Sequence, residues 1–268
     1  AEARGEFVAR MDADDRAHPW RLAMQAHFLT LHPAVDFCGT AVRRFGAVRP
    51  HALRYPTDHE TIRAFALFDT PLCHPTAMWR RAAFERAGLQ YDGRFYPSED
   101  YDLWVRALSA LRGANLPEVL LDYRVRAGSM TGAEWGEMDE QAARIAERQL
   151  RALGLAPTPE DLRRHRHIAL HRPARSLEEL AAMDQWLRRI AEANAKRGCL
   201  RDTAIRRVLR DFWWQSCMNS TTLGAGVWRL NRRATFRARG APAVLLALSI
   251  PVSYTHLRAH ETPEHLVC

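Results

Sequence analysis

The chain has 268 residues, of which 47% are hydrophobic and 26% are charged, and its formal net charge is +8. This composition suits a globular body with a sizeable core, and the length suits one domain with an appendage. There is no internal repeat, and the scattered cysteines lack the spacing of a metal site, which favours reduced thiols in a cytoplasmic protein. A basic surface of this kind would favour an anionic membrane face or a nucleotide-linked substrate.

An acidic motif follows the first apolar run of the chain. Residues 7–11 predict a buried strand, and Asp12, Asp14 and Asp15 come directly after it. A turn at Asp15 can bring the carboxylates of Asp12 and Asp14 around one cation. Hard oxygen ligands suit Mg²⁺ or Mn²⁺, which keep open positions for phosphate oxygens, and ligands bind at this end of strands in open α/β sheets. The alternative is an acidic turn that caps the helix predicted over 19–31.

Further elements follow in chain order, and they alternate between strands and helices. We expect strands over 36–45 and 120–124, and helices over 58–68, 80–87 and 100–111. This pattern predicts an α/β fold with a mixed sheet and flanking helices.

A second acidic motif opens the helix predicted over 100–111. Glu99, Asp100 and Asp102 lie in or just before its first turn, where the helix dipole favours acids, so stabilisation alone explains one or two of them. A carboxylate at this point, beside Tyr101 and Trp104, is suited to accept a proton from a bound hydroxyl. The two acidic motifs are far apart in sequence, which suits one site assembled from two loops.

With both motifs in view, the chain resembles the family 2 glycosyltransferases of the GT-A fold. Order and spacing fit over about the first half of the chain, and the resemblance does not specify the sugar. It is carried by segments within 5–15, 19–25, 32–33, 39–40, 73–80, 99–106 and 116–124.

The resemblance implies a role for each acidic motif. Asp12 and Asp14 match the DxD pair that holds a divalent cation, Mg²⁺ or Mn²⁺, on the diphosphate of the donor. Asp100 matches the general base that acts on the acceptor hydroxyl. Enzymes of this family transfer the sugar with inversion in one in-line displacement, and charge on the departing diphosphate is offset by the metal.

Four further residues are candidates for substrate binding. Glu99 precedes the expected base, and Trp104 is expected to wall the acceptor site. His74 and Arg106 could face phosphate or acceptor, and each could equally be structural, because a lone basic residue usually has a structural partner.

The partners follow from the same resemblance. We expect a nucleotide-sugar donor and a glycan or lipid-linked acceptor, in bacterial surface polysaccharide or glycan synthesis. We expect no nucleic-acid partner, and a cytoplasmic location that allows peripheral contact with the inner face of the cell membrane.

Two alternative functions are less well supported by the sequence. A metal-dependent phosphohydrolase would need a nucleophilic Asp followed by Thr or Ser, or a His-rich two-metal shell, and neither is present near Asp12. A non-enzymatic basic binding module would give no reason for the clustered acids.

The sequence changes character after the first half. We expect residues 1–132 to form the acceptor-side, metal-binding half of a GT-A domain, and 133–250 to form a helical region. Periodicity and capping signals predict helices over 134–153, 160–170, 176–196 and 201–218. His165, His167 and His171 have arginine neighbours, so we interpret them as a solvated face rather than a metal cluster.

Both ends of the chain carry their own expectations. Family members begin with a strand and about two βα units that hold the nucleotide base, and we find no such pattern here, so we expect an N-terminally truncated enzyme that is inactive alone and still binds Mn²⁺ weakly. The run 241–251 is apolar but too short to span a bilayer. Residues 251–268 resemble a translated sequencing adapter and are set aside as an artefactual tail.

Overall fold

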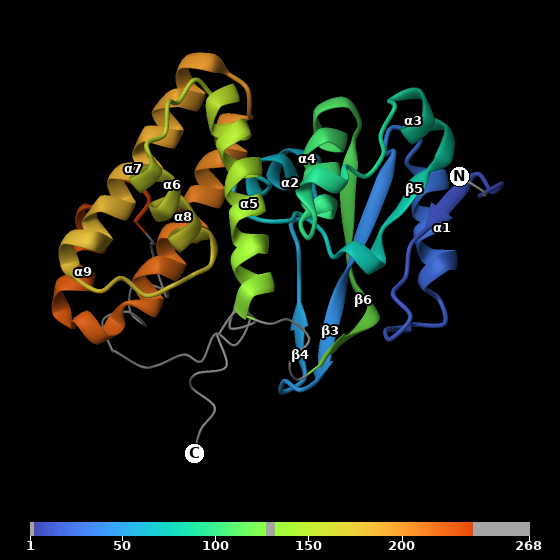
Figure 1. Ribbon diagram of the computed structural model, residues 1–268, viewed down its shortest axis with the longest axis horizontal. Helices are drawn as coiled ribbons and strands as arrows, with labels where there is room; N and C mark the ends of the chain where they lie inside the picture. The colour runs from blue at the N-terminus through green and yellow to red at the C-terminus, as the bar shows by residue number, and fades with distance from the viewer. Residues whose placement is uncertain (1–2, 127–131, 238–268) are drawn as a thin grey trace. The chain divides into compact units, whose positions relative to one another are not determined.

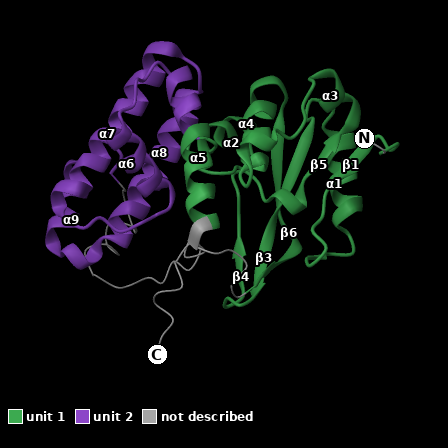
Figure 2. Cartoon of the chain, viewed as in Figure 1, with its two compact units in different colours: residues 1–145 green, residues 146–268 purple. Residues whose placement is uncertain are grey.

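The computed structural model describes residues 3–126 and 132–237 (Figure 1). The chain divides into two compact units, residues 1–145 and residues 146–268 (Figure 2). The predicted artefactual tail at 251–268 and the apolar run at 241–251 lie outside the described residues. None of the helices in the described ranges combines the length and the apolar character needed to cross a membrane.

The first unit is built on a six-stranded mixed sheet. Its strand order is β1-β5-β3-β6-β2, with β4 paired to the other part of β3. The pairing of β3 with β6 is parallel, and every other pairing is antiparallel. The strands are β1 Phe7–Ala9, β2 Arg16–Ala17, β3 Phe37–Gly46, β4 His51–Leu53, β5 Met78–Arg80 and β6 Gly113–Val125.

Helices and short 3-10 turns connect these strands. Asp58 caps α2 by accepting a hydrogen bond from the Thr61 backbone N–H, and α4 carries three acids in its first turn, as expected from the helix dipole. The elements are α1 Arg21–Leu31, α2 His59–Phe65, η1 His74–Thr76, α3 Arg81–Arg86, η2 Gly93–Phe95 and α4 Glu99–Ala110.

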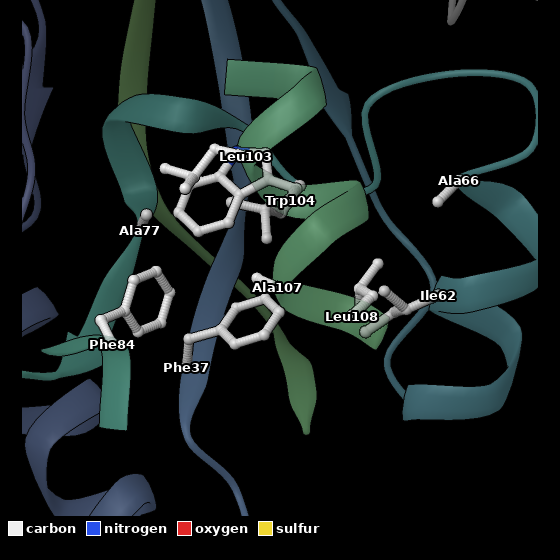
Figure 3. Close-up of a cluster of buried hydrophobic side chains, with 10 residues drawn as sticks. Phe37, Ile62, Ala66, Ala77, Phe84, Leu103, Trp104, Ala107 and Leu108 are labelled. Carbon is white, nitrogen blue, oxygen red and sulfur yellow. The ribbon is translucent and has the colours of Figure 1, made fainter. Parts of the chain in front are cut away.

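The alternation of side chains along β3 gives the sheet two buried faces. Phe37 packs into a cluster with residues of α2, α3 and α4, whereas its neighbour Cys38 packs into a second cluster with Leu29 of α1. Figure 3 shows the first cluster, in which the Phe37 and Trp104 rings stack with centroids 5.5 Å apart. At Gly113 a Cβ atom would lie 2.5 Å from the Phe37 ring, so only glycine allows this close approach.

The second unit is helical. Helix α5, Gly132–Ala152, leads into it, and it is followed by α6 Pro159–Ala169, α7 Leu177–Arg197, α8 Asp202–Asn219, η3 Thr221–Leu223 and α9 Ala225–Arg233. Apolar stripes on these helices form the core, which includes the fully buried side chains of Ile190, Leu209 and Trp213.

The predicted fold class, a mixed sheet with flanking helices followed by a helical region, is confirmed. The helices predicted within 19–31, 58–68, 80–87 and 100–111 are present with ends shifted by a few residues. The short strands β2, β4 and β5 were not expected. Strand β6 begins at Gly113, well before the predicted start at 120.

The predicted solvated face of histidines is wrong for His165. Its side chain is fully buried, and its Nδ1 accepts a hydrogen bond from Trp186 Nε1 at 3.1 Å. The helical periodicity around it predicted a helix but not which of its polar residues would face the core.

Candidate active site

The loop that carries the first acidic motif is fixed by a buried arginine. The Arg21 side chain is 1% exposed, and its guanidinium donates to the Arg10 carbonyl oxygen at 2.6 Å and to Gln25 Oε1 at 3.1 Å. The Arg10 backbone N–H donates to the Ala77 carbonyl oxygen at 2.9 Å. These bonds hold the chain immediately after β1, so Asp12 and its neighbours project from a fixed point.

Asp15 ties the same loop to β6. Its side chain is 7% exposed, and its Oδ1 accepts a hydrogen bond from the Arg124 backbone N–H at 2.8 Å. The Arg124 guanidinium donates to the Asp14 carbonyl oxygen at 3.0 Å. Asp15 Oδ2 is buried without a hydrogen-bond partner among the described residues, and burial raises the pKa of this carboxyl. The sequence assigned Asp15 only to a turn, and the structure adds this anchoring contact.

Both expected metal ligands are in ion pairs with arginines. Asp12 Oδ1 lies 2.5 Å from a terminal guanidinium nitrogen of Arg10. Asp14 Oδ2 lies 2.9 Å from Nε of Arg126, which follows the end of β6. The side chains of Asp12 and Asp14 are 35% and 29% exposed, so both carboxylates are accessible from solvent.

The chemistry of these two acids is compatible with a divalent cation only if a substrate supplies further ligands. Across the part of the chain that the structure describes, no group of three or more His, Cys, Asp or Glu side chains is arranged to hold a metal ion. Mg²⁺ is commonly held by one or two carboxylates together with substrate phosphates, and Asp12 and Asp14 supply such a pair. Both carboxylates also raise the pKa of Asp15, which places the three acids within electrostatic reach of one another.

Asp100 lies in the first turn of α4. Its Oδ1 accepts a hydrogen bond from the Tyr101 backbone N–H at 2.7 Å, and the Tyr101 hydroxyl donates to the Ala66 carbonyl oxygen at 2.7 Å. Burial, with a smaller contribution from the negative charge of Glu99, raises the pKa of Asp100 to about 6. A carboxylate that titrates near neutral pH can take up a proton during a reaction more effectively than an ordinary aspartate.

The fold brings the two acidic motifs to one region. Burial, together with the charges of Asp15, Asp100 and Asp12, raises the pKa of the Cys73 thiol to about 12, so these three carboxylates act on one residue. Arg10 acts in the opposite direction on both motifs, because its charge lowers the pKa of Asp15 and of Asp100. Charges of both acidic motifs thus act on the same residues, and one site assembled from the two loops stays a prediction.

His74 lies beside this region in η1. Its Nε2 is 3.2 Å from the Tyr91 hydroxyl, and its Nδ1 is buried with no hydrogen-bond partner in the described ranges. Burial, followed by the charge of Arg10, lowers the pKa of His74 to about 3, so the imidazole is neutral at physiological pH. A neutral imidazole can donate or accept one hydrogen bond at its free nitrogen but cannot act as a fixed cation for phosphate.

Trp104 is a core residue. Its side chain has no exposed surface and packs against Phe37 and Phe84 (Figure 3). Its ring also contacts Trp79, and it meets His74 edge to face with centroids 5.6 Å apart. The expectation that Trp104 walls the acceptor site is corrected on this point, because a fully buried ring can support the site only through His74. The apolar residues of α4 recur at helical spacing, and this pattern favours a position for Trp104 in the core.

Two other candidates have contrasting surroundings. Arg106 pairs with the fully buried Asp102 at 2.7 Å and donates to the Gln90 carbonyl oxygen at 2.7 Å. These contacts are those of a structural residue, which is one of the two roles that the sequence allowed for Arg106. Glu99 is partly buried, and its Oε2 has no hydrogen-bond partner among the residues described. Glu99 therefore keeps an acceptor available, whereas the Arg106 guanidinium is occupied.

Three residues of this region were not expected from the sequence. Arg10 and Arg126 pair with the acids, and Tyr91 is 48% exposed beside His74. Arg10 adjoins the acidic motif, which is a signal that could have identified it. Tyr91 lies only a few residues before Glu99 but carries no sequence signal of its own, and Arg126 lies far from either motif and is brought here by the pairing of β6.

Comparisons with known proteins match the N-terminal part of the chain. Residues 1–88 match Glycosyl transferase family 2. The amylovoran biosynthesis glycosyltransferase AmsE of Erwinia amylovora is 39% identical over 124 residues, which cover 46% of this chain and 45% of AmsE. The O-antigen biosynthesis glycosyltransferase WbnJ of Escherichia coli is 36% identical over 125 residues, covering 44% of this chain and 47% of WbnJ. This chain thus spans about half the length of these relatives.

Among solved structures, residues 1–349 of S. aureus TarS in complex with UDP-GlcNAc align with 88% of this chain and 70% of that chain, at 17% identity and a TM-score of 0.43. That score is too low to establish a shared fold by itself. The sequence matches are stronger, and they include the loop with Asp12 and Asp14. Residues 1–88 of this chain are thus similar to glycosyl transferase family 2, and the matched segments of AmsE and WbnJ agree with that similarity.

Proposed function

We propose that this region transfers a sugar from a nucleotide-sugar donor to an acceptor hydroxyl, with inversion at the anomeric carbon. The observation that carries the proposal is the convergence of Asp100, whose pKa is raised to about 6, with the loop of Asp12 and Asp14 in a segment matched by family 2. A raised pKa beside a cluster of like charges is typical of a site that handles protons.

Each acid has a separate task in this reaction. Asp100 takes the proton of the acceptor hydroxyl as its oxygen forms the new bond to the anomeric carbon, and the bond from that carbon to the diphosphate oxygen breaks. A Mg²⁺ or Mn²⁺ ion held by Asp12 and Asp14 would offset the charge of the departing diphosphate. Burial of Asp100 supports the assignment, because a base must retain affinity for a proton near neutral pH.

The groups around Asp100 are suited to a hydroxylated acceptor. Glu99 Oε2 and His74 Nδ1 are buried polar atoms without partners in the described part of the chain, and an unpaired buried polar atom costs free energy that a ligand can recover. The exposed ring of Tyr91 beside His74 offers an apolar face for a sugar ring. We propose that these three residues contact the acceptor.

The matched relatives indicate the class of product. AmsE and WbnJ are described as glycosyltransferases of amylovoran and O-antigen biosynthesis, both of which concern polysaccharide. We therefore propose a glycan or lipid-linked acceptor in polysaccharide biosynthesis. In this proposal residues 1–132 form the acceptor-side and metal-binding half of a GT-A domain, and residues 133–250 form a helical region.

The proposal is tested by binding of Mn²⁺ and pyrophosphate to the full chain. Pyrophosphate is the probe because it needs only the cation site and no nucleotide-base contacts. We expect calorimetry to show pyrophosphate binding with Mn²⁺ and none with EDTA, and Asp14→Asn to weaken that binding strongly. Asp122→Asn is the matched control, because Asp122 is similarly exposed, 25% against 29%, and also pairs with an arginine. Equal binding in EDTA, or by Asp14→Asn, would contradict the proposal.

A further inference from the structure

We propose that Arg10 and Arg126 change partners during donor binding: they neutralise Asp12 and Asp14 in the free protein and turn to the donor's diphosphate when a divalent cation takes over the two carboxylates. This inference rests on the proposed function and adds a coupling between the two ligands. Its consequence is that cation and diphosphate bind cooperatively, and neither binds well alone.

The first pair is held on a fixed backbone. The Arg10 carbonyl oxygen and N–H are bonded to Arg21 and Ala77, at 2.6 Å and 2.9 Å, so Arg10 changes partner by side-chain rotation only. The Arg10 side chain as a whole is 30% exposed, and its Nη1, which is itself buried, lies 2.5 Å from Asp12 Oδ1. The same charge acts on Asp100, His74 and the Tyr91 hydroxyl, which places it between the two acidic motifs.

The second pair is more exposed and joins distant parts of the chain. Arg126 follows β6, its side chain is 62% exposed, and its Nε lies 2.9 Å from Asp14 Oδ2. The neighbouring Arg124 is committed elsewhere, since its guanidinium donates to the Asp14 carbonyl oxygen and lies 4.7 Å from the centroid of the Phe45 ring. Arg124 therefore holds the loop, and Arg126 is free to rotate toward solvent.

The chemistry of the two ligands favours such an exchange. Exposed ion pairs are weak, so a divalent cation can displace a guanidinium from a carboxylate. A guanidinium presents a planar set of donors that matches phosphate oxygens in a bidentate manner. A diphosphate therefore offers Arg10 and Arg126 better partners than the carboxylates they give up.

Charge balance predicts the cooperativity. In the free protein two carboxylates face two guanidinium groups, so the set is neutral. A divalent cation alone would displace the guanidinium groups and leave three cationic centres against two carboxylates. Diphosphate alone would meet two carboxylates that repel it. Only the two ligands together restore a nearly neutral set, and each should thus raise the affinity of the other.

The test measures Mn²⁺ affinity by electron paramagnetic resonance, with and without saturating pyrophosphate, in the full chain. In the unsubstituted protein we expect pyrophosphate to tighten Mn²⁺ binding by about five- to ten-fold or more. In Arg126→Gln and in Arg10→Gln, Mn²⁺ alone should bind about two- to five-fold more tightly, because the competing ion pair is gone. Pyrophosphate should then add less affinity than it adds in the unsubstituted protein.

Arg43→Gln is the matched control. Arg43 pairs with Asp122 at 2.7 Å with exposures of 58% and 25%, close to the 62% and 29% of Arg126 and Asp14, and it should leave both affinities unchanged. Mn²⁺ and pyrophosphate also associate in solution, and Asp14→Asn measures that background. Thermal unfolding of Arg10→Gln and Arg126→Gln shows whether each variant is folded. Arg126→Gln is sufficient by itself to test the exchange, because its side chain is exposed and its loss should not prevent folding.

The outcomes separate this inference from the proposed function. If the unsubstituted protein binds no Mn²⁺ and pyrophosphate beyond the Asp14→Asn background, the proposed function fails. If it binds both and Arg126→Gln keeps the full coupling with an unchanged affinity for Mn²⁺ alone, the partner exchange is wrong and the metal site stands.

Discussion

The ion pairs of the two units differ in how they are built. In the helical unit most of them join an arginine to an acid three or four residues away on the same helix, so each pair would form in an isolated helix and adds a few tenths of a kcal/mol. These pairs are Arg151–Glu147, Arg164–Glu160, Arg164–Asp161, Arg188–Asp184 and Arg206–Asp202. In the sheet unit Arg126 reaches Asp14 only after β6 has paired into the sheet. The sheet unit also has local helical pairs, such as Arg81–Glu85 and Arg106–Asp102, but the Arg126–Asp14 pair depends on the fold. It is one of the two pairs for which we propose an exchange of partners.

The buried tryptophans show a second difference between the units. In the helical unit Trp186 Nε1 donates to His165 and Trp213 Nε1 donates to Asn231, at 3.1 Å and 3.0 Å. In the sheet unit Trp104 Nε1 is equally buried and has no hydrogen-bond partner among the described residues. An unpaired donor is costly in a core, and such costs are tolerated mainly where a site requires a particular arrangement.

The largest effect is expected at Asp100. In a form of the protein that shows sugar transfer, Asp100→Asn should lower the turnover number by about 10²–10⁴-fold, the usual contribution of a general base. Because the amide keeps the shape and can still accept the Tyr101 N–H bond, Mn²⁺-dependent pyrophosphate binding and thermal stability should change little. Turnover near that of the unsubstituted protein would show that another group is the base.

The next effect concerns the core beneath the site. Trp104→Ala should destabilise the sheet unit by about 3–5 kcal/mol, because it removes a fully buried ring that packs on Phe37 and Phe84. Trp20→Ala, at a side chain that is 66% exposed, should change the stability by less than about 0.5 kcal/mol. Hydrogen exchange measured by mass spectrometry would locate the loss. Equal protection losses in α8 and in β3 would contradict the division into two separately stabilised units.

Elements that depend on interactions between residues close in sequence could be predicted, whereas elements that depend on distant segments could not. The helices of the second unit were predictable because their signals are local, as in the Ser176 cap of α7 and the apolar stripe of α8. Strands β2, β4 and β5 have only two or three residues each and carry no periodic signal of their own. Their existence depends on pairing with β6 and β3, which sequence pattern alone does not specify.

In the candidate site, too, the sequence predicted the local motifs but not the contacts between them and other residues. Asp12, Asp14 and Asp100 could be proposed as a group because each acidic motif is contiguous and follows or opens a predictable element. Their pairing with Arg10 and Arg126 was missed. Trp104 was predicted to line the acceptor site, because the sequence does not show whether an aromatic residue beside acids binds a ligand or packs in the core. Its burial in the structure decides between the two.

Glu99 provides a pH-dependent test that is confined to the sheet unit. Burial, with a contribution from the charge of Glu99, raises the pKa of Asp100 to about 6, so Glu99→Gln should lower that pKa. The base must be ionised, and the acid limb of the pH–rate profile should accordingly move to lower pH. Carbon NMR of the Asp100 carboxyl measures the same change without turnover. A shift to higher pH, or none, would show that Glu99 does not act on Asp100.

The smallest effect is expected from a helix cap in the other unit. Thr158 and Asp161 form a capping box at α6, in which Thr158 Oγ1 accepts from the Asp161 N–H at 3.1 Å and Asp161 Oδ2 accepts from the Thr158 N–H at 3.0 Å. Thr158→Ala removes the first bond and should cost about 1 kcal/mol of unfolding free energy, measured by denaturant titration, whereas Thr158→Ser keeps the hydroxyl and should cost much less.

Because this device is local, Thr158→Ala should leave Mn²⁺ and pyrophosphate binding unchanged, in contrast to Asp14→Asn. The cap satisfies a backbone N–H of its own helix and contributes no charge to the acidic loops. A loss of pyrophosphate binding comparable to that of Asp14→Asn, in a variant that remains folded, would mean that the helical unit shapes the site. The cap would then contribute to ligand binding as well as to the stability of its own helix.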